Sequence, residues 1–148
     1  MRAPFVWDAA NGPCSTFAWI KGGAPGQAVI SQTDGTGFGG TWLGLDPSDG
    51  KLFTKLMFVE LKSEAMIPDG DWHHLSLVWD GSHRYLYLDG TEIARDATAL
   101  SYALSCNGGL NIGADKDLST GSFFTGLIDD VRIYDVALSA EEIEVLAR

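Results

Sequence analysis

Residues 126–147 read GLIDDVRIYDVALSAEEIEVLA, a run of strand-forming residues followed by a helix-like segment. Alternate residues of a regular strand point to the same face of a sheet. The pattern therefore predicts that Asp129 shares a face with three apolar residues: Leu127, Val131 and Ile133. A carboxylate on such a face is costly to bury unless it has a partner or reaches water. Three explanations stay open for Asp129: a structural anchor held by backbone amides or an arginine, a calcium ligand, or a β-bulge that turns it to solvent.

The end of this stretch carries the signals of a short helix over Ala140–Ala147. Ser139 is a favoured N-cap residue, and Glu142 follows three positions later, which completes a capping box. Ile143 and Leu146 form a short apolar stripe. We therefore expect a helix that packs on the surface of a sheet.

Upstream, short apolar runs alternate with glycine and aspartate turns, a pattern typical of an all-β protein. Asp80-Gly81 and Asp89-Gly90 each separate two strand-like runs, and Asp-Gly favours hairpin turns. The expected strands are Pro4–Trp7, Thr16–Lys21, Ala28–Gln32, Thr41–Leu45, Leu52–Phe58, His74–Trp79, Arg84–Leu88, Glu92–Arg95, Gly109–Gly113 and Phe124–Tyr134. With the terminal helix, they predict an antiparallel jelly-roll sandwich of two sheets.

Length and net charge limit the number of domains and the kinds of partner that this protein can have. The 148 residues suffice for a single domain with a sizeable core, and no linker or internal repeat divides residues 1–148. The net charge of −10 argues against nucleic acid and anionic membranes as partners, and suits neutral or cationic ligands and calcium. The sequence shows neither an apolar run of membrane-spanning length nor the apolar segment of a signal peptide. The expectation is a cytoplasmic protein, or a mature or excised piece of a longer one.

Two cysteines, Cys14 and Cys106, leave open one long-range disulfide or two buried thiols, and we favour the thiols. No CxxC pair or Cys/His spacing indicates a metal site. No serine or cysteine can be tied to a histidine, so nucleophilic catalysis has no support.

Three quoted stretches occur together: FAWIKGG (Phe17–Gly23), DGDWHHLSLVWDGSHRYLYLDG (Asp69–Gly90) and GLIDDVRIYDVALSAEEI (Gly126–Ile143). In this order and spacing they resemble the laminin G-like family of the concanavalin A-like lectin/glucanase superfamily. The resemblance covers roughly Thr16 to the C-terminus. It implies a jelly roll of two antiparallel sheets that works as a binding or adhesion module, often for carbohydrate and often with calcium. It also implies an extracellular location and attachment to a larger protein.

The N-terminus departs from this family pattern. Family members usually open with a strand and an acidic, glycine-containing turn, whereas APFVWDAANGP (residues 3–13) precedes the first matching motif here. We therefore expect a shortened first strand and the loss of any calcium site that relies on that turn. A shortened first strand leaves a sheet edge open, and open edges recruit partners, so a homo-oligomer is also expected.

The best candidate for a ligand-binding surface surrounds Trp42. Sugar sites stack an exposed aromatic ring on a pyranose and hold its hydroxyls with amides and carboxylates. Trp42 follows the glycine-rich loop TDGTGFGG, and glycine lets the backbone approach a ligand closely. The expected site comprises Trp42, Phe38, Asp34 and Asp46, with Phe123 of a second loop on its rim. Ordinary packing is the alternative for these residues.

Other aromatic and histidine residues are expected to be structural. Trp19 and Trp72 fall within the family-like strand motifs and are expected in the core, whereas Trp79 precedes a hairpin turn and fits either core or surface. His73 and His74 are adjacent, so a regular strand turns them to opposite faces and they cannot bind one metal together.

No catalytic site is expected. Glycosidases on this superfold resemble one another in a strand that bears Glu-x-Asp-x-x-Glu or a near variant, and the sequence contains no such motif. The main hypothesis is a non-catalytic module that binds carbohydrate. One alternative is a protein-interaction domain that assembles through an open sheet edge. The other is a shuffled fragment of a larger secreted protein with no present ligand.

Overall fold

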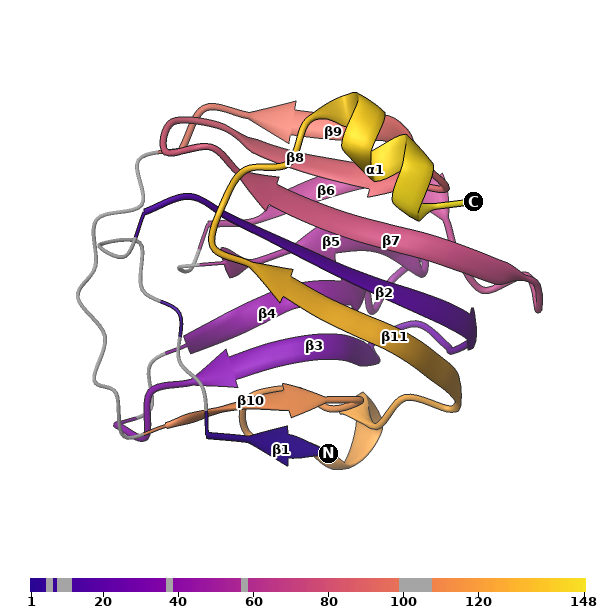
Figure 1. Ribbon diagram of the computed structural model, residues 1–148. Helices are drawn as coiled ribbons and strands as arrows, with labels where there is room; N and C mark the ends of the chain where they lie inside the picture. Colours follow the sequence, from indigo (N-terminus) through magenta and orange to yellow (C-terminus); the bar gives the residue numbers. More distant parts are fainter. Residues whose placement is uncertain (5–6, 8–11, 37–38, 57–58, 99–107) are drawn as a thin grey trace.

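The computed structural model describes the chain except residues 5–6, 8–11, 37–38, 57–58 and 99–107 (Figure 1). It consists of two antiparallel sheets stacked face to face, with a short helix on the outer side of one sheet. The two-sheet jelly roll expected from the sequence is confirmed.

The first sheet, sheet A, has the strand order β1-β10-β3-β4-β5-β6. Its strands are β1 (Arg2–Ala3), β3 (Ala28–Thr33), β4 (Gly39–Leu45), β5 (Lys51–Thr54), β6 (Leu61–Met66) and β10 (Gly109–Ile112). The second sheet, sheet B, has the order β11-β2-β7-β8-β9. Its strands are β2 (Cys14–Gly22), β7 (Trp72–Trp79), β8 (Arg84–Leu88), β9 (Thr91–Asp96) and β11 (Gly126–Tyr134).

The hairpins predicted at the two Asp-Gly pairs are confirmed, because β7 pairs with β8 and β8 with β9. Strand β6 is missed by the sequence prediction, since LKSEAM contains no β-branched or aromatic residue. The strand predicted over Leu52–Phe58 ends at Thr54, and β5 then pairs with β6. The strand predicted over Pro4–Trp7 falls partly outside the described residues, and Arg2–Ala3 forms the described N-terminal strand.

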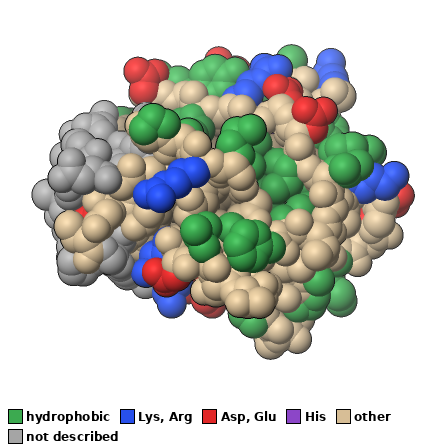
Figure 2. Space-filling model, turned by 90° about the horizontal axis from the view of Figure 1, so that it is seen from below, with side chains coloured by type: hydrophobic (Ala, Val, Ile, Leu, Met, Phe, Trp, Pro, Cys, Tyr) green, Lys and Arg blue, Asp and Glu red, His purple; other side chains and the backbone are tan. Residues whose placement is uncertain are grey.

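An apolar cleft lies between the two sheets, where Met1 and β10 face β11. Its volume is about 460 Å³. The lining residues are Met1, Leu110, Ile112, Ile128, Asp129, Asp130, Val131 and Ile133. Figure 2 views the molecule from the β1 side and shows hydrophobic side chains gathered on this face.

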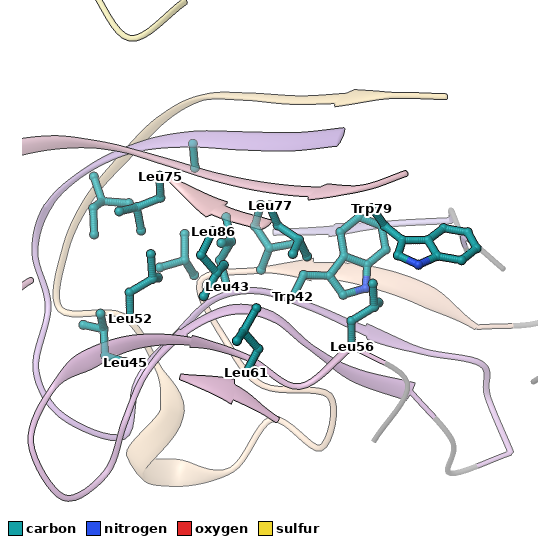
Figure 3. Close-up of a cluster of buried hydrophobic side chains, with 14 of the residues drawn as sticks. Trp42, Leu43, Leu45, Leu52, Leu56, Leu61, Leu75, Leu77, Trp79 and Leu86 are labelled. Atoms are coloured by element: carbon teal, nitrogen blue, oxygen red, sulfur yellow. The ribbon is translucent and has the colours of Figure 1, made fainter. Parts of the chain in front are cut away.

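Aliphatic side chains from both sheets fill the interior (Figure 3). Leu75 and Leu86 of sheet B meet Leu43 and Leu52 of sheet A, and all four are fully buried. Burial of each such side chain stabilises the fold by roughly 1.5–3 kcal/mol relative to exposure. This core fixes which face of every strand looks inward.

Three tryptophans extend the core at one end of the sandwich. The Trp7 ring lies 5.4 Å from that of Trp79 and 6.3 Å from that of Trp42, in edge-to-face geometry. All three side chains are buried, which assigns Trp79 to the core.

The helix α1 (Ala140–Leu146) begins with the predicted capping box. The Glu142 amide donates to Ser139 Oγ at 3.2 Å, and the Ser139 amide donates to Glu142 Oε2 at 2.8 Å. Ile143 is fully buried and packs with Phe17, Val78 and Tyr87 on the outer face of sheet B. The helix therefore covers one part of that face (Figure 1).

Cys14 is a buried free thiol, and burial raises its pKa to about 12. This confirms the thiol favoured for Cys14 and leaves it unreactive near neutral pH. Cys106 lies outside the described residues. No helix in the described part of the chain is long and apolar enough to cross a membrane.

Candidate functional site

A β-bulge in β11 decides where Asp129 points. The pairing of β11 with β2 shifts register between Asp129 and Arg132, and Asp130 adopts a left-handed backbone with φ 49°. Aspartate tolerates this region better than most residues. The extra residue lets Ile128 and Val131 both pack against the core.

The expectation that Asp129 shares an apolar face is therefore wrong. Asp129 lies opposite Trp19 of β2 and is exposed. Its Oδ1 accepts a hydrogen bond from the Asp130 amide at 2.8 Å. Of the three explanations open from the sequence, the bulge that turns this carboxylate to solvent is the one observed.

Two tryptophans lie on the same outer face of sheet B. Trp19 pairs in register with His74 of β7, and Trp72 pairs with Lys21 of β2. Trp72 is 42% exposed and Trp19 is partly buried. The core position expected for Trp72 is wrong because its face of β7 looks outward, beyond the residues that pack with α1.

Together, these residues form an open hollow on the outer face of sheet B. It has a volume of about 370 Å³ and is lined by Trp19, Trp72, Asp129 and Asp130. Three strands contribute to it: β2, β7 and β11. We refer to this arrangement as the tryptophan hollow.

His74 lies beside Trp19 on the outer face of sheet B, as its register partner on β7. It is buried, lies 5.2 Å from Trp19 edge-to-face, and stacks on Phe17 at 5.6 Å. Burial lowers the pKa of His74, so its imidazole is neutral at neutral pH. An uncharged aromatic ring therefore packs against the edge of Trp19.

Charge at the hollow is unevenly compensated. Arg132 Nε donates to Asp130 Oδ1 at 2.8 Å, and this hydrogen bond raises the pKa of the guanidinium. Within the described residues, no cationic side chain forms an ion pair with Asp129. The hollow therefore presents one paired and one unpaired carboxylate.

His73 faces the side opposite to His74, as expected for neighbours in a strand. Its Nδ1 lies 2.8 Å from Asp89 Oδ2, and its Nε2 lies 2.9 Å from Asp69 Oδ2. Burial works to lower the pKa of His73, but hydrogen bonds from the ring to Asp89 and Asp69 outweigh it and raise the pKa. This cluster joins the start of β7 to the turn after β8.

The five residues predicted around Trp42 do not form one described site. Trp42 is 1% exposed and packs in the core, so no ligand can stack on it in this structure. Asp34 and Asp46 follow β3 and β4 at opposite ends of this antiparallel pair. Phe38 lies outside the described residues. Phe123 is half exposed and lines a separate hollow that includes Met1 and Leu118.

Asp34 and Asp46, the two aspartates predicted at the ligand site, form local hydrogen bonds within turns. Asp34 Oδ1 accepts from the Thr36 amide and hydroxyl, both at 2.8 Å. Asp46 accepts hydrogen bonds from the Ser48 hydroxyl and amide and pairs with Lys62 at 3.2 Å. These contacts lower the pKa of Asp46 to about 2, with the Ser48 bonds as the main cause. Both residues stabilise turns.

Calcium ligation is not visible in the arrangement of acidic groups. Calcium takes six to eight oxygen ligands. In the described part of the chain, no group of three or more histidine, cysteine, aspartate or glutamate side chains is placed to hold a metal ion. Calcium binding by Asp129 stays a prediction.

Sequence reasoning missed the tryptophan hollow, although one signal was present. Trp19 shares its strand parity with Lys21, while Ala18 and Ile20 have the opposite parity. The charged residue marks the outward face. That signal identifies the face on which Trp19 lies, but it does not tell whether another described element covers this face.

Comparisons with known proteins agree with this architecture. The sequence profile of a laminin G-like family, described as the concanavalin A-like lectin/glucanases superfamily, matches residues 5–144. No curated protein matches the chain.

Several solved structures are similar in fold. A SAP-like pentraxin from Limulus polyphemus, described as heptameric, has a TM-score of 0.72 at 18% identity, over 92% of this chain and 70% of that one. Domain 4 of the extracellular arabinanase AbnA from Geobacillus stearothermophilus, in complex with arabinotriose, has a TM-score of 0.71 at 20% identity, over 93% and 67%. A Trypanosoma rangeli sialidase has a TM-score of 0.69 at 16% identity, over 93% of this chain and 23% of that one. At these identities the likeness shows the fold alone.

Proposed function

The chain belongs to the concanavalin A-like lectin/glucanase superfamily, and we propose that it is a carbohydrate-binding module whose ligand occupies the tryptophan hollow. The observation that supports this site most strongly is the exposure of Trp72 beside Trp19 and an outward carboxylate. An exposed aromatic ring stacks on the apolar face of a sugar ring. Asp129 and Asp130 can accept hydrogen bonds from its hydroxyls.

The fold comparisons are consistent with ligand binding. The AbnA domain is described in complex with arabinotriose, and its parent protein as extracellular. By analogy, we place glycan binding and an extracellular location within the same proposal.

We propose that the module binds without bond cleavage. Glycosidases of the common type need two carboxyl groups on opposite sides of the scissile bond. In the tryptophan hollow, Asp129 and Asp130 are adjacent in one strand, and Arg132 pairs with the second. The absence of the Glu-x-Asp-x-x-Glu pattern from the sequence supports the same conclusion.

Tryptophan fluorescence tests the proposal. A panel of neutral and charged oligosaccharides is titrated into the protein, and quenching or a spectral shift reports binding. Trp72→Ala should weaken binding by about two- to tenfold, since an aromatic contact contributes roughly 0.5–1.5 kcal/mol. Its unfolding free energy should fall by about 1 kcal/mol or less, because much of the ring is already exposed.

Phe123→Ala is the matched control, since Phe123 is an exposed aromatic residue outside the hollow. It should bind as the wild type does. Loss of binding in this variant, with Trp72→Ala unaffected, would place the ligand at the loop after β10 instead. No response to any oligosaccharide would reject glycan binding.

A protein-interaction role is the second candidate, favoured by the free edge of β11. One side of this strand is unpaired among the described residues, and the apolar cleft runs beside it. An added strand would satisfy free backbone groups and cover Ile128 and Ile133. The bulge at Asp130 interrupts the edge and limits such pairing. Sedimentation velocity over a wide concentration range tests it, and a monomer throughout would exclude pairing between copies.

A further inference from the structure

We infer that the tryptophan hollow selects glycans that carry a positive charge, namely amino sugars with free amines, over neutral or acidic glycans. This inference rests on the proposed function and specifies its ligand class. It follows from the charges and rings that face the hollow.

Asp129 provides the charge that distinguishes the ligand. It is exposed, and no cationic side chain of the described chain pairs with it. The neighbouring Asp130 is already neutralised by Arg132 at 2.8 Å. Lys21 lies opposite Trp72 in the β2–β7 register, but it is not among the residues that line the hollow. A ligand ammonium therefore gains a partner that no protein cation occupies.

The two indole rings favour the same ligand. The face of a tryptophan carries negative electrostatic potential and attracts cations, more strongly than tyrosine or phenylalanine does. Trp19 and Trp72 line the hollow with Asp129, so an ammonium there can contact an indole and a carboxylate together. His74 is buried beside Trp19 and its pKa is lowered by burial, so it adds no opposing charge. The chain's net charge of −10 adds long-range attraction for cations.

A neutral sugar obtains only part of these interactions. It can stack on an indole and donate hydroxyl hydrogen bonds, but it gains no charge-assisted bond to Asp129. An acidic sugar would meet an unpaired carboxylate of its own sign. The hollow should therefore rank cationic sugars first, neutral sugars second and acidic sugars last.

Two tetramers that differ mainly in charge test this ranking: β-1,4-linked glucosamine and its N-acetylated counterpart. Each is titrated by calorimetry and by tryptophan fluorescence at a mildly acidic pH that keeps the amines protonated. The glucosamine tetramer should bind about tenfold more tightly, because one charge-assisted hydrogen bond distinguishes the two ligands. Added salt should weaken its binding more than that of the acetylated tetramer.

The variant Asp129→Asn tests whether the preference for the glucosamine tetramer arises in the tryptophan hollow. This variant should reduce the preference to about threefold or less, while binding of the acetylated tetramer changes little. Asp117→Asn makes the same charge change at an exposed carboxylate on the loop after β10 and should retain the full preference. It separates local recognition from the effect of net charge.

The outcomes distinguish the inference from the proposed function. Equal affinity for both tetramers, or a preference that survives Asp129→Asn, overturns the inference while the proposed function stands. Binding of neither tetramer nor any neutral oligosaccharide overturns both. Binding of the glucosamine tetramer that Trp72→Ala leaves unchanged also overturns the inference, because the cation would then be bound elsewhere.

Discussion

Substitution of Asp130 tests the feature that builds the tryptophan hollow. Its backbone φ of 49° lies in the left-handed region, which aspartate and asparagine tolerate and β-branched residues do not. We compare Asp130→Val with Asp130→Asn. Both remove the carboxylate that pairs with Arg132, so the ion pair cancels in the comparison.

Strain of the backbone at position 130 sets the expected difference in stability between the two variants. A β-branched residue in the left-handed region costs about 1–2 kcal/mol. Both side chains of the Asp130–Arg132 ion pair are exposed, so its loss lowers the stability of either variant only a little. For a domain of this length, 1 kcal/mol corresponds to roughly 2–4 °C in melting temperature, so Asp130→Val should melt about 2–8 °C below Asp130→Asn.

Thermal and urea unfolding followed by tryptophan fluorescence measure this difference. The valine variant should also lose ligand affinity, since a straightened β11 would turn Asp129 away from Trp19. Equal melting temperatures for the valine and asparagine variants would refute the reasoning. The left-handed residue would then not be needed to keep Ile128 and Val131 in the core.

Three further predictions follow from the fold. Ile143→Ala should lower the unfolding free energy by about 2–5 kcal/mol, because it removes the side chain that packs α1 against sheet B. Val145 is exposed on the same helix, so Val145→Ala should change the unfolding free energy by less than about 1 kcal/mol. Urea unfolding compares the two variants, and equal effects would contradict this packing. The pKa of His73 is raised in the folded state, so its protonated ring stabilises the fold. This contribution to the unfolding free energy is complete below the ordinary histidine pKa of about 6.5, and it is lost as the pH rises through the higher pKa of the folded state. Unfolding measured across this range should show that decline in the wild type and not in His73→Gln. Calcium ligation by Asp129 predicts that EDTA lowers the melting temperature and that added calcium restores it, and an unchanged melt would dismiss that role.

The sequence predicted most of the strands because their signals are local. Alternation of side chains and Asp-Gly turns specify β7, β8 and β9, and the capping box specifies α1. Strand β6 escaped prediction because its residues are poor strand formers, and its pairing with β5 supplies what propensity does not.

The candidate site was less predictable. Trp42 lies near a glycine-rich loop, which suggested a ligand surface, yet its ring fills the core between the sheets. Trp72 lies within a family motif, which suggested the core, yet it lies on the outer face of sheet B and is 42% exposed. Strand periodicity says which residues share a face, but it does not say what covers that face.

By itself, the sequence determined the all-β class, the helix and, outside the bulge in β11, the residues of a strand that share a face. These depend on backbone preferences and on the two-residue period of a strand, which act over a few residues. Only the tertiary structure decided that Asp129 turns outward and meets Trp19, and that α1 leaves this part of sheet B open. The reason is that the apolar core is built from strands that are distant in sequence, so which side chains are buried depends on how these strands pack together. The bulge in β11 is the arrangement that keeps both Ile128 and Val131 inside and places the carboxylate in water.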